Sequence, residues 1–306
     1  MLFISFMTFM PRLGIDLGGT KIAGIVLAED GRVLWDARVA TPREDYAGTI
    51  EAIADLVAAG EQAAGGRCTV GLGIPGAISP ATGLVKNANS TWLNGRPFQQ
   101  DLERRLARSV RLANDANCLA VSEASDGAAA GARVVFGVIL GTGCGGGVVV
   151  GQDVITGANA IAGEWGHNPL PWPEDDERPG PKCYCGQHGC LEVFLSGPGI
   201  AADYARRGGG PCRSEEIVAR ADRGEALAAT ALDVWERRLA RALATIINVL
   251  DPDVIVVGGG LSRLERVYKN VPSQWGAWVF SDRVVTKLVP AKHGDASGVR
   301  GAARLW

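Results

Sequence analysis

The feature that most constrains the fold is a glycine turn between two apolar segments near the start of the chain. Residues 13–17 (Leu-Gly-Ile-Asp-Leu) lead into Gly18-Gly19-Thr20-Lys21, and the apolar residues 22–27 follow. Aliphatic and β-branched residues favour strands, and paired glycines permit positive φ and close approach of the backbone to a ligand. The pattern predicts strand, turn and strand, with turn N–H groups that can hold an anion.

The residues beside this turn indicate what it binds. Asp16 stands where a carboxylate can hold hydrated Mg²⁺ beside phosphates, and Lys21 adds a positive charge. An ordinary β-hairpin with a Gly-Gly turn remains an alternative. A P-loop is excluded, because Thr20-Lys21 reverses the required order and no helix follows.

Composition restricts the class of protein. The chain has 306 residues, 47% of them apolar and 21% charged, which is typical of a globular protein long enough for two lobes. A net charge of −2 gives no electrostatic basis for binding nucleic acid or an anionic membrane. We expect residues 1–9 to be a mis-assigned start, since Met7 and Met10 are alternative starts and no export signal is recognisable. A cytoplasmic location follows, where clustered cysteines indicate metal rather than disulfides.

The opening pattern recurs in the second half of the chain. An apolar strand is predicted over 134–140, a glycine turn over 141–147 and a second strand over 148–150. Gly141, Gly143 and Gly146 match a dinucleotide-binding pattern, but a strand rather than a helix follows, so that fold is excluded. We expect the two copies to hold one nucleotide between them. A third glycine turn, Gly258-Gly259-Gly260, follows a predicted strand over 254–257.

Other elements follow from apolar periodicity and from breakers. We predict strands over 31–35, 70–74 and 110–113, and helices over 49–64, 98–108, 116–124, 225–250 and 298–306. A polar loop is expected over 87–92. The stretch 171–181, rich in proline and acidic residues, is predicted to be an exposed and mobile excursion.

Three of the seven cysteines stand close together. Cys183, Cys185 and Cys190 lie within eight residues of each other, and thiolates at that density in a reducing compartment usually bind zinc. A closed zinc site needs a fourth ligand, and the chain has three histidines, one of which, His188, lies inside the cysteine loop. Coincidental cysteines are the alternative.

Three glycine turns that each follow an apolar strand are more specific together than any one alone. Asp16-x-Gly18-Gly19-Thr20-Lys21, Gly141-Thr142-Gly143 and Gly258-Gly259-Gly260 resemble the two phosphate motifs and the adenosine motif of the actin-like/sugar-kinase ATPase superfamily. Glu164-Trp165-Gly166-His167 and the cysteine segment through Glu192 look like the signature of its ROK sugar-kinase branch. The resemblance runs from about residue 12 to residue 306. Within the branch, segments 85–95 and 162–172 most resemble bacterial fructokinases (mannofructokinases).

This resemblance implies a fold and its organisation. The expected fold is an α/β, two-lobed actin-like ATPase (ribonuclease H-like) fold, with duplicated strand–glycine turn–strand units and helices packed on mixed sheets. Residues 10–118 would form the N-terminal lobe and 119–293 the C-terminal lobe, and 294–306 would be a closing helix that returns to the N-terminal lobe. Proteins of this kind are usually homodimers.

The resemblance also implies roles for residues. Asp115, between a predicted strand and helix, is the expected general base for phosphoryl transfer, although from the residues alone it is equally well a helix N-cap. The expected sugar-binding residues are Asn89, Asn114, Asp115, Glu164, His167 and Glu192. His167 would complete a structural zinc site with Cys183, Cys185 and Cys190. ATP with Mg²⁺ would be bound by Asp16, Gly18, Gly19, Thr20, Lys21, Gly141, Thr142, Gly143, Gly258, Gly259 and Gly260.

The implied activity is an ATP-dependent hexose kinase, with fructose as the expected substrate and fructose 6-phosphate as the product. Glucose, mannose and N-acetylglucosamine are alternative substrates, since nearly the same motifs serve them all. A ROK-type transcriptional repressor is not expected, because the first phosphate motif begins within about fifteen residues of the start and the chain is acidic. A non-catalytic sugar sensor is a further alternative, which intact Asp16, Lys21 and Asp115 disfavour.

Overall fold

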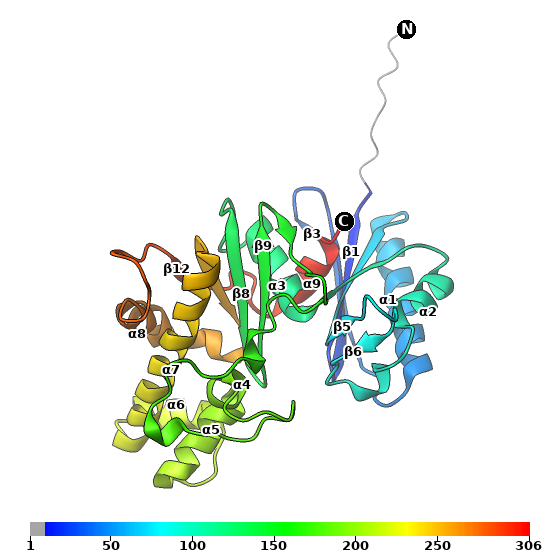
Figure 1. Cartoon of the computed structure of the whole chain (residues 1–306). Helices are drawn as coiled ribbons and strands as arrows, with labels where there is room; N and C mark the ends of the chain where they lie inside the picture. The colour runs from blue at the N-terminus through cyan, green and yellow to red at the C-terminus, as the bar shows by residue number, and fades with distance from the viewer. Residues whose placement is uncertain (1–9) are drawn as a thin grey trace. The chain divides into compact units, whose positions relative to one another are not determined.

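The computed structural model describes residues 10–306, which divide into two compact units (Figure 1). One unit comprises Met1–Ser122, described from residue 10, together with Thr156–Ile161 and Ala296–Trp306, and the other comprises Glu123–Ile155 and Ala162–Asp295. The chain changes unit after Ser122 and after Asp295, and residues 156–161, which were expected in the C-terminal lobe, belong to the first unit. The expected mis-assigned start, residues 1–9, lies outside the described residues.

The first unit is built on a five-stranded sheet in the order β3-β2-β1-β4-β7. β1, β2 and β3 pair antiparallel, whereas β1, β4 and β7 run parallel. Its elements are β1 (Arg12–Leu17), β2 (Lys21–Leu27), β3 (Val33–Ala40), α1 (Tyr46–Ala64), β4 (Thr69–Ile74), β5 (Ala77–Ile78), β6 (Val85–Lys86), η1 (Thr91–Leu93), α2 (Phe98–Leu106), β7 (Arg111–Asn114), α3 (Asp115–Ser125, continuing into the second unit) and α9 (Ser297–Ala303).

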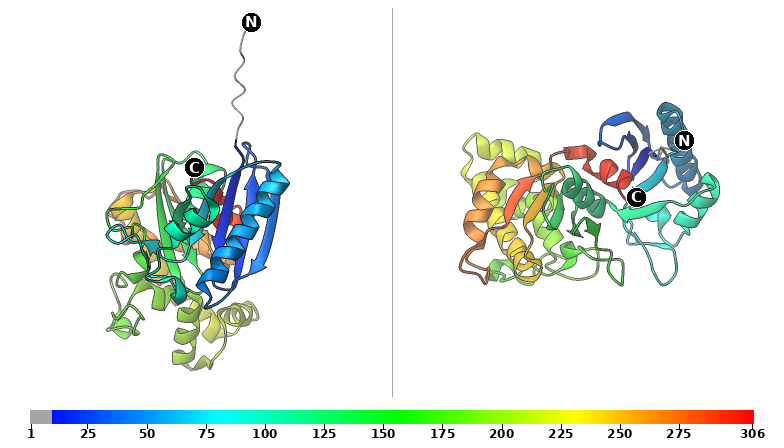
Figure 2. Two further views of the ribbon diagram at one scale, coloured as in Figure 1. Left: turned by 90° about the vertical axis from the view of Figure 1, so that its right-hand side faces the viewer. Right: turned by 90° about the horizontal axis from the view of Figure 1, so that it is seen from above.

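Helices cover both faces of this sheet. Leu13 and Ile15 are fully buried in the apolar cluster that includes the inner face of α1, which lies along the strands in Figure 2. On the opposite face, a Cβ atom on Gly14 would lie 2.1 Å from the carbonyl oxygen of Val299. The C-terminal helix α9 thus packs directly on the backbone of β1, and glycine is required there for steric reasons.

The second unit repeats this plan in a sheet of order β10-β9-β8-β11-β12. β8, β9 and β10 pair antiparallel, and β8, β11 and β12 run parallel. Its elements are β8 (Val134–Leu140), β9 (Cys144–Val150), β10 (Asp153–Val154), η2 (Trp165–His167), η3 (Asp175–Glu177), α4 (Leu191–Leu195), α5 (Gly197–Tyr204), η4 (Ala205–Gly209), α6 (Ser214–Asp222), α7 (Ala226–Leu250), β11 (Val254–Gly258), η5 (Gly260–Arg263), α8 (Glu265–Trp275), β12 (Lys287–Pro290) and η6 (Gly294–Ala296, whose last residue belongs to the first unit). The predicted duplication of strand, glycine turn and strand is confirmed.

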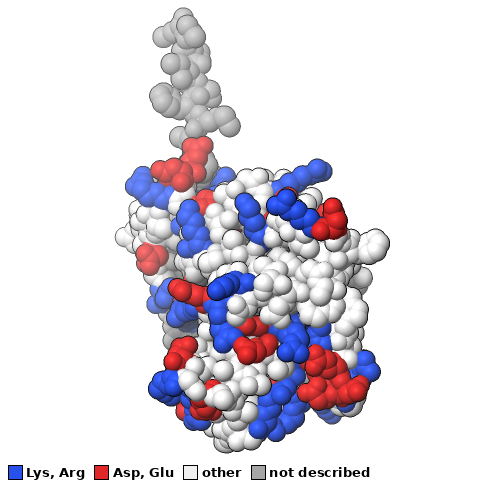
Figure 3. Space-filling model, turned by 90° about the vertical axis from the view of Figure 1, so that its left-hand side faces the viewer, with Lys and Arg blue, Asp and Glu red and all other residues white. Residues whose placement is uncertain are grey.

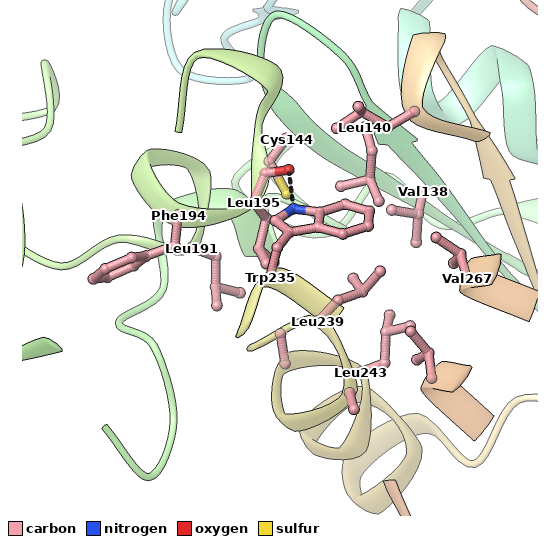
Figure 4. Packing of buried hydrophobic residues seen from close by; sticks show 14 of the residues in the cluster. Val138, Leu140, Cys144, Leu191, Phe194, Leu195, Trp235, Leu239, Leu243 and Val267 are labelled. Atoms are coloured by element: carbon pink, nitrogen blue, oxygen red, sulfur yellow. Dashed lines mark hydrogen bonds between the residues drawn. The ribbon is translucent and has the colours of Figure 1, made fainter. Parts of the chain in front are cut away.

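The core of the second unit is centred on the long helix α7. Trp235, only 1% exposed, packs among side chains of the sheet and of α7, including Leu140 and Leu239 (Figure 4). Its indole N–H donates to the carbonyl oxygen of Leu195 at 3.0 Å. The buried indole therefore keeps its hydrogen bond and fixes the end of α4 against α7.

The predicted glycine turn over 141–147 was too long. β9 begins at Cys144, so residues 145–147 lie in the strand and pair with β8. A Cβ atom on Gly146 would lie 2.7 Å from the carbonyl oxygen of Gly163 and 2.9 Å from the indole of Trp165. Gly146 thus permits a close approach by the segment before η2.

Several other boundaries also differ from the prediction. The strand predicted over 31–35 is β3, Val33–Ala40, and the helix predicted over 98–108 ends at Leu106, where Ala107 adopts a left-handed conformation. Helices α4, α5, α6 and α8 were not predicted.

The stretch 171–181 is not the wholly exposed excursion that was expected. Glu177, 3% exposed, accepts hydrogen bonds from Arg238 Nε at 2.8 Å and from Arg241 Nη2 at 2.7 Å. Burial alone would raise the pKa of Glu177, but the two arginines hold it below its ordinary value. A buried ion cluster therefore anchors this stretch on α7, where composition had indicated a solvated loop.

Charges of both signs are interspersed on the face drawn in Figure 3. This distribution agrees with the net charge of −2 and shows no extended basic surface on that face. Among residues 10–306, no helix is both long and apolar enough to cross a bilayer.

Candidate functional site

Hydrogen bonds to Gly18 hold the first glycine turn in place, and the other residues of the turn are exposed. The N–H of Gly18 donates to the Lys21 carbonyl oxygen at 3.0 Å, which closes the hairpin between β1 and β2. The Thr41 hydroxyl donates to the Gly18 carbonyl oxygen at 2.7 Å. Gly19, Thr20 and Lys21 are exposed. A turn held in this way can present backbone N–H groups and a lysine to an anion.

Asp16 lies at the carboxyl edge of the parallel strands. It pairs in register with Gly73 of β4, which pairs in turn with β7. Its carboxylate lies so close to α9 that a Cβ atom on Gly298 would be 3.1 Å from Oδ2. Burial raises the pKa of Asp16, an effect that the positive charges of Lys21 and Arg38 partly oppose. Among the described residues no group donates a hydrogen bond to this carboxylate. Asp16 therefore stands beside the turn as an acid whose burial is only partly offset by Lys21 and Arg38.

Asn114 and Asp115 stand at the same edge, where β7 ends and α3 begins. The N–H of Ala116 donates to Asn114 Oδ1 and to Asp115 Oδ1, both at 2.8 Å. The amide of Asn114 contacts the Gly76 carbonyl oxygen at 3.4 Å. Because α3 begins at Asp115, the bond from the Ala116 N–H to Asn114 Oδ1 is the one that an N-cap makes. Asp115, which the N-cap alternative had named, is instead the first helical residue, and it is exposed.

The loop that carries Asn89 packs on the turn after β4. Gly76 has a φ of 76°, and a Cβ atom there would lie 2.3 Å from the backbone of loop 86–88. Asn94 holds the loop by accepting from the Ala88 N–H at 2.9 Å and donating to the Ala88 carbonyl oxygen at 2.8 Å. Asn89 follows as an exposed side chain. The sequence did not predict this role of Asn94. The only sign of it was the position of Asn94 next to the polar loop.

In the second unit, the second and third glycine turns lie side by side. Gly141 N–H donates to the Gly143 carbonyl oxygen at 3.0 Å, and its own carbonyl oxygen accepts from Gly197 N–H at 2.8 Å. Gly258 is the buried last residue of β11. Gly259 has a φ of 81°, and a Cβ atom on it would lie 2.4 Å from the Leu140 carbonyl oxygen. The third turn therefore packs on the end of β8.

A cavity of about 650 Å³ opens beside these turns. It is bounded by Gly141, Thr142 and Gly260 on one side and by residues of α5 and α6 on the other. Apolar side chains such as Ala201, Val218 and Leu261 supply part of the lining. The glycine motifs predicted one wall of this cavity. The helical wall was missed, because no short motif marks it.

The segment Glu164 to His167 lies flat against β9. Trp165 is buried, and its indole N–H donates to the Gly145 carbonyl oxygen at 2.9 Å. A Cβ atom on Gly166 would lie 1.9 Å from the Cys144 carbonyl oxygen. Trp165 and Gly166 thus dock the η2 turn on the strand and fix the positions of the two predicted ligands that flank them.

His167 and the three clustered cysteines converge. One ligand atom from each of His167, Cys183, Cys185 and Cys190 lies within 4.8 Å of the others. Cys183 Sγ is 3.6 Å from His167 Nδ1, and Cys185 Sγ is 3.6 Å from Cys190 Sγ. A zinc tetrahedron with ordinary bond lengths separates its ligand atoms by about 3.6–3.8 Å, so the donor set fits that ion. His188 is directed elsewhere, toward the Gly180 carbonyl oxygen.

Two further groups border this cluster. Glu192 Oε2 accepts from the Cys144 N–H at 3.0 Å, at the end of the second glycine turn. Tyr184 Oη lies 3.0 Å from His167 Nε2. No role was predicted for Tyr184 from the sequence, because it is only the variable middle residue of a Cys-x-Cys pair.

Known proteins resemble the chain along almost its full length. The model of the ROK family matches residues 12–306. The chain is 40% identical over 296 residues to N-acetyl-D-glucosamine kinase of Shigella flexneri serotype 5b (strain 8401), which covers 95% of this chain and 98% of that protein. The ROK hexokinase from Thermus thermophilus has a TM-score of 0.86 at 32% identity, over 96% of this chain and 97% of that one. A ROK family glucokinase from Streptomyces griseus, solved in complex with glucose and AMPPNP, has a TM-score of 0.77 at 29% identity, over 96% and 98%. The expected actin-like ATPase fold is confirmed by these likenesses.

Proposed function

Since this chain belongs to the ROK family over residues 12–306, we propose that it is an ATP-dependent sugar kinase that transfers the γ-phosphoryl group of ATP to a sugar hydroxyl. The observation that carries the proposal is the 40% identity, over 98% of its length, to a protein named N-acetyl-D-glucosamine kinase. The glycine turns and the carboxylates described above are the groups that such a reaction requires. Phosphoryl transfer depends on positioning and on electrostatic stabilisation of the phosphates.

We assign ATP to the glycine turns and to the cavity beside two of them. Gly18 to Lys21 and Gly141 to Gly143 would bind the phosphates, and Gly258 to Gly260 would border the adenosine. The cavity of about 650 Å³ has apolar side chains that suit a purine ring. Asp16 would hold Mg²⁺, which supplies charge stabilisation to the phosphates when bound. The absence of a hydrogen-bond donor to Asp16 among the described residues, together with the loss of hydration there, suits this role.

We assign the sugar to the polar side chains that the sequence predicts for it. Asp115 would accept the proton of the attacking hydroxyl, because an exposed carboxylate beside Asn114 can come within hydrogen-bond reach of a bound sugar. Asn89, Asn114, Glu164, His167 and Glu192 would pair with the remaining hydroxyls. Such pairing rejects a molecule that lacks the partner group.

We further propose a structural zinc ion at His167, Cys183, Cys185 and Cys190. The 3.6 Å separations between donor atoms support a closed tetrahedral site. The ion would fix the cysteine loop to the His167 segment. Glu192 follows this loop, so the metal would also set the position of that carboxylate.

Two sugars have a specific observation in their favour. N-acetylglucosamine ranks first, because it is the substrate in the name of a relative 40% identical to this chain. Fructose, the substrate expected from segments 85–95 and 162–172, ranks second and stays a prediction. Homodimer formation and a cytoplasmic location also stay predictions.

The proposal is tested by ADP release from Mg-ATP with N-acetylglucosamine, fructose, glucose and mannose, each at several concentrations. ATP without sugar gives the background of hydrolysis. We expect sugar-dependent ADP release, with the highest kcat/KM on N-acetylglucosamine. A higher value on fructose would restore the expectation from the sequence and leave the kinase assignment in place. If zinc-loaded, folded protein released no ADP above background with any of the four sugars, the kinase assignment would be wrong.

A further inference from the structure

The hydroxyl of Ser90 is buried beside the first glycine turn and is not used by the fold. Ser90 is 2% exposed, and among residues 10–306 no group makes a hydrogen bond with its Oγ. Ser90 is the N-cap residue of η1, where a serine usually accepts from a helix N–H, yet its side chain makes no such bond. A buried hydroxyl without a partner costs free energy of folding. The fold therefore keeps a hydrogen-bond donor beside the turn without using it for its own stability.

The turn contains one peptide group that no hydrogen bond holds. Thr41 fixes the peptides on both sides of it, since its hydroxyl donates to the Gly18 carbonyl oxygen at 2.7 Å and its N–H donates to the Thr20 carbonyl oxygen at 3.1 Å. The peptide between them joins Gly19 to Thr20, and no hydrogen bond connects it to another described residue. Gly19 and Thr20 are both exposed. This peptide can thus rotate without breaking a hydrogen bond.

Ser90 faces this peptide across an open space. Apart from the residues next to it in the chain, a Cβ atom on Gly19 would meet one atom within 4 Å, Ser90 Oγ at 3.9 Å. Gly19 has no positive φ, so neither its conformation nor its surroundings in this structure demand a glycine. A glycine does, however, leave the adjacent peptide free to take another orientation. The space between Gly19 and Ser90 suits a peptide that turns its carbonyl group toward the hydroxyl.

We propose that Ser90 is a positioning residue for the phosphates of ATP: when they occupy the first glycine turn, its hydroxyl donates to the Gly19 carbonyl oxygen and holds the Thr20 N–H toward the phosphate. The inference rests on the proposed function, in which Gly18 to Lys21 bind phosphate. The C=O and N–H of a trans peptide point in opposite directions, so a bond on one side fixes the donor on the other. Because Ser90 follows Asn89, one loop would carry a sugar-binding side chain and the group that orients the phosphate turn.

Two buried serines allow a matched test in the full-length protein. Ser90→Ala removes the proposed donor. Ser122→Ala is the control, because Ser122 is 0% exposed and its hydroxyl also has no partner among the described residues, but it lies in the second half of α3. Three quantities are measured: the melting temperature without nucleotide, the dissociation constant of Mg-AMPPNP by calorimetry, and the KM for sugar from ADP release.

We expect Ser90→Ala to be at least as stable as the wild type without nucleotide, because it loses a buried hydroxyl that has no partner. It should nevertheless bind Mg-AMPPNP about 2- to 10-fold more weakly, the loss expected for one hydrogen bond. Its KM for sugar should not change, since the sugar-binding loop keeps its own contacts. Ser122→Ala should bind Mg-AMPPNP like the wild type.

Wild-type affinity for Mg-AMPPNP in Ser90→Ala would overturn the inference. A lower melting temperature or a failure to fold would overturn it too, because the hydroxyl would then have a partner in the nucleotide-free protein. A rise in sugar KM equal to the loss of nucleotide affinity would assign Ser90 to the sugar loop instead. A wild type that does not bind Mg-AMPPNP would overturn the inference together with the ATP assignment, whereas one that binds it but phosphorylates no sugar would overturn only the proposed function.

Discussion

The carboxylate of Glu192 accepts a hydrogen bond from the backbone N–H of Cys144, with 3.0 Å between the heavy atoms. Cys144 is the first residue of β9, directly after the second glycine turn, and Glu192 follows the last clustered cysteine in α4. A Cβ atom on Gly143 would lie 2.8 Å from the same carboxylate oxygen. One side chain thus links the cysteine loop to the turn that we assign to phosphate.

Removal of this carboxylate leaves a buried N–H without its partner. We expect Glu192→Ala to lower the free energy of unfolding by about 1–3 kcal/mol and to raise the KM for sugar. Glu192→Gln keeps an oxygen acceptor, so its unfolding free energy should stay closer to the wild type. Urea denaturation and sugar-dependent ADP release provide the two measurements. Equal stability of the Ala variant and the wild type would mean that the hydrogen bond to Cys144 contributes nothing.

We expect Asp16 to lower the stability of the fold and to be required for activity. Burial raises the pKa of Asp16 in the folded chain, so carrying its charge at neutral pH opposes folding. Asp16→Asn should therefore melt at a higher temperature than the wild type at neutral pH. This advantage should shrink as the pH falls through the raised pKa toward the ordinary value of about 3.9, because the wild-type carboxyl then becomes neutral as well. Loss of the Mg²⁺ ligand should lower kcat by about 100-fold or more.

Thermal melts across a pH series, with Asp30→Asn as the control at an exposed acid of the first unit, check the Asp16 prediction. An Asp16→Asn variant that is less stable than the wild type at every pH would show that the charged carboxylate is favourable in the fold.

Zinc should contribute to the stability of the second unit. We expect Cys190→Ser to abolish stoichiometric zinc, lower the melting temperature and raise the KM for sugar, because a three-ligand site no longer holds the loop before Glu192. Cys68→Ser, at a buried thiol of the first unit, controls for the loss of a sulfur atom and should retain zinc. Elemental analysis measures the metal. Wild-type protein that contains no zinc when grown with ample zinc would refute this part of the account.

The buried ion cluster around Glu177 should be essential for stability. Glu177→Gln removes the acidic partner of the buried Arg241 and one of the two acidic partners of the buried Arg238, whose other partner is Asp203. We expect it to lower the free energy of unfolding by about 3–5 kcal/mol. Glu51→Gln breaks an exposed pair with Arg105 and should change stability little. Because the pKa of Glu177 is lowered by folding, its contribution is present at neutral pH and is lost as the pH falls below the ordinary carboxyl value. A loss no larger than that of the Glu51 variant would contradict the prediction.

The strands and turns that depend on local sequence were predictable. The strand over 134–140 was predicted with the bounds it has in the structure, and the hairpin around Gly18 was anticipated, because apolar runs broken by glycine specify such elements directly. Glycines 145–147 were assigned to a turn, since glycine favours turns locally. Gly146 is needed for another reason, since a side chain there would collide with the backbone of Gly163, and this contact arises only in the tertiary structure.

The candidate site was predictable to the extent that its residues form short motifs. His167 and the cysteines could be named, although the sequence could not show that Nδ1 rather than Nε2 faces the thiols. Tyr184 and the helical wall of the cavity act through contacts between segments separated in the sequence, and Asn94 acts through a loop contact six residues away, so no short motif reveals them. Glu177 was assigned to a solvated stretch because its partners lie about sixty residues away, in α7.

The central claim is that Asp115 removes the proton from a sugar hydroxyl during transfer from ATP. The most direct measurement is ADP release from Mg-ATP and N-acetylglucosamine by Asp115→Asn, beside the wild type and Asp153→Asn, a control at an exposed acid of the second unit. Asparagine keeps an oxygen that can accept from the Ala116 N–H, so folding and sugar affinity should persist. The account predicts a kcat lower by about 100-fold or more for Asp115→Asn alone. Turnover equal to the wild type in that variant would contradict it.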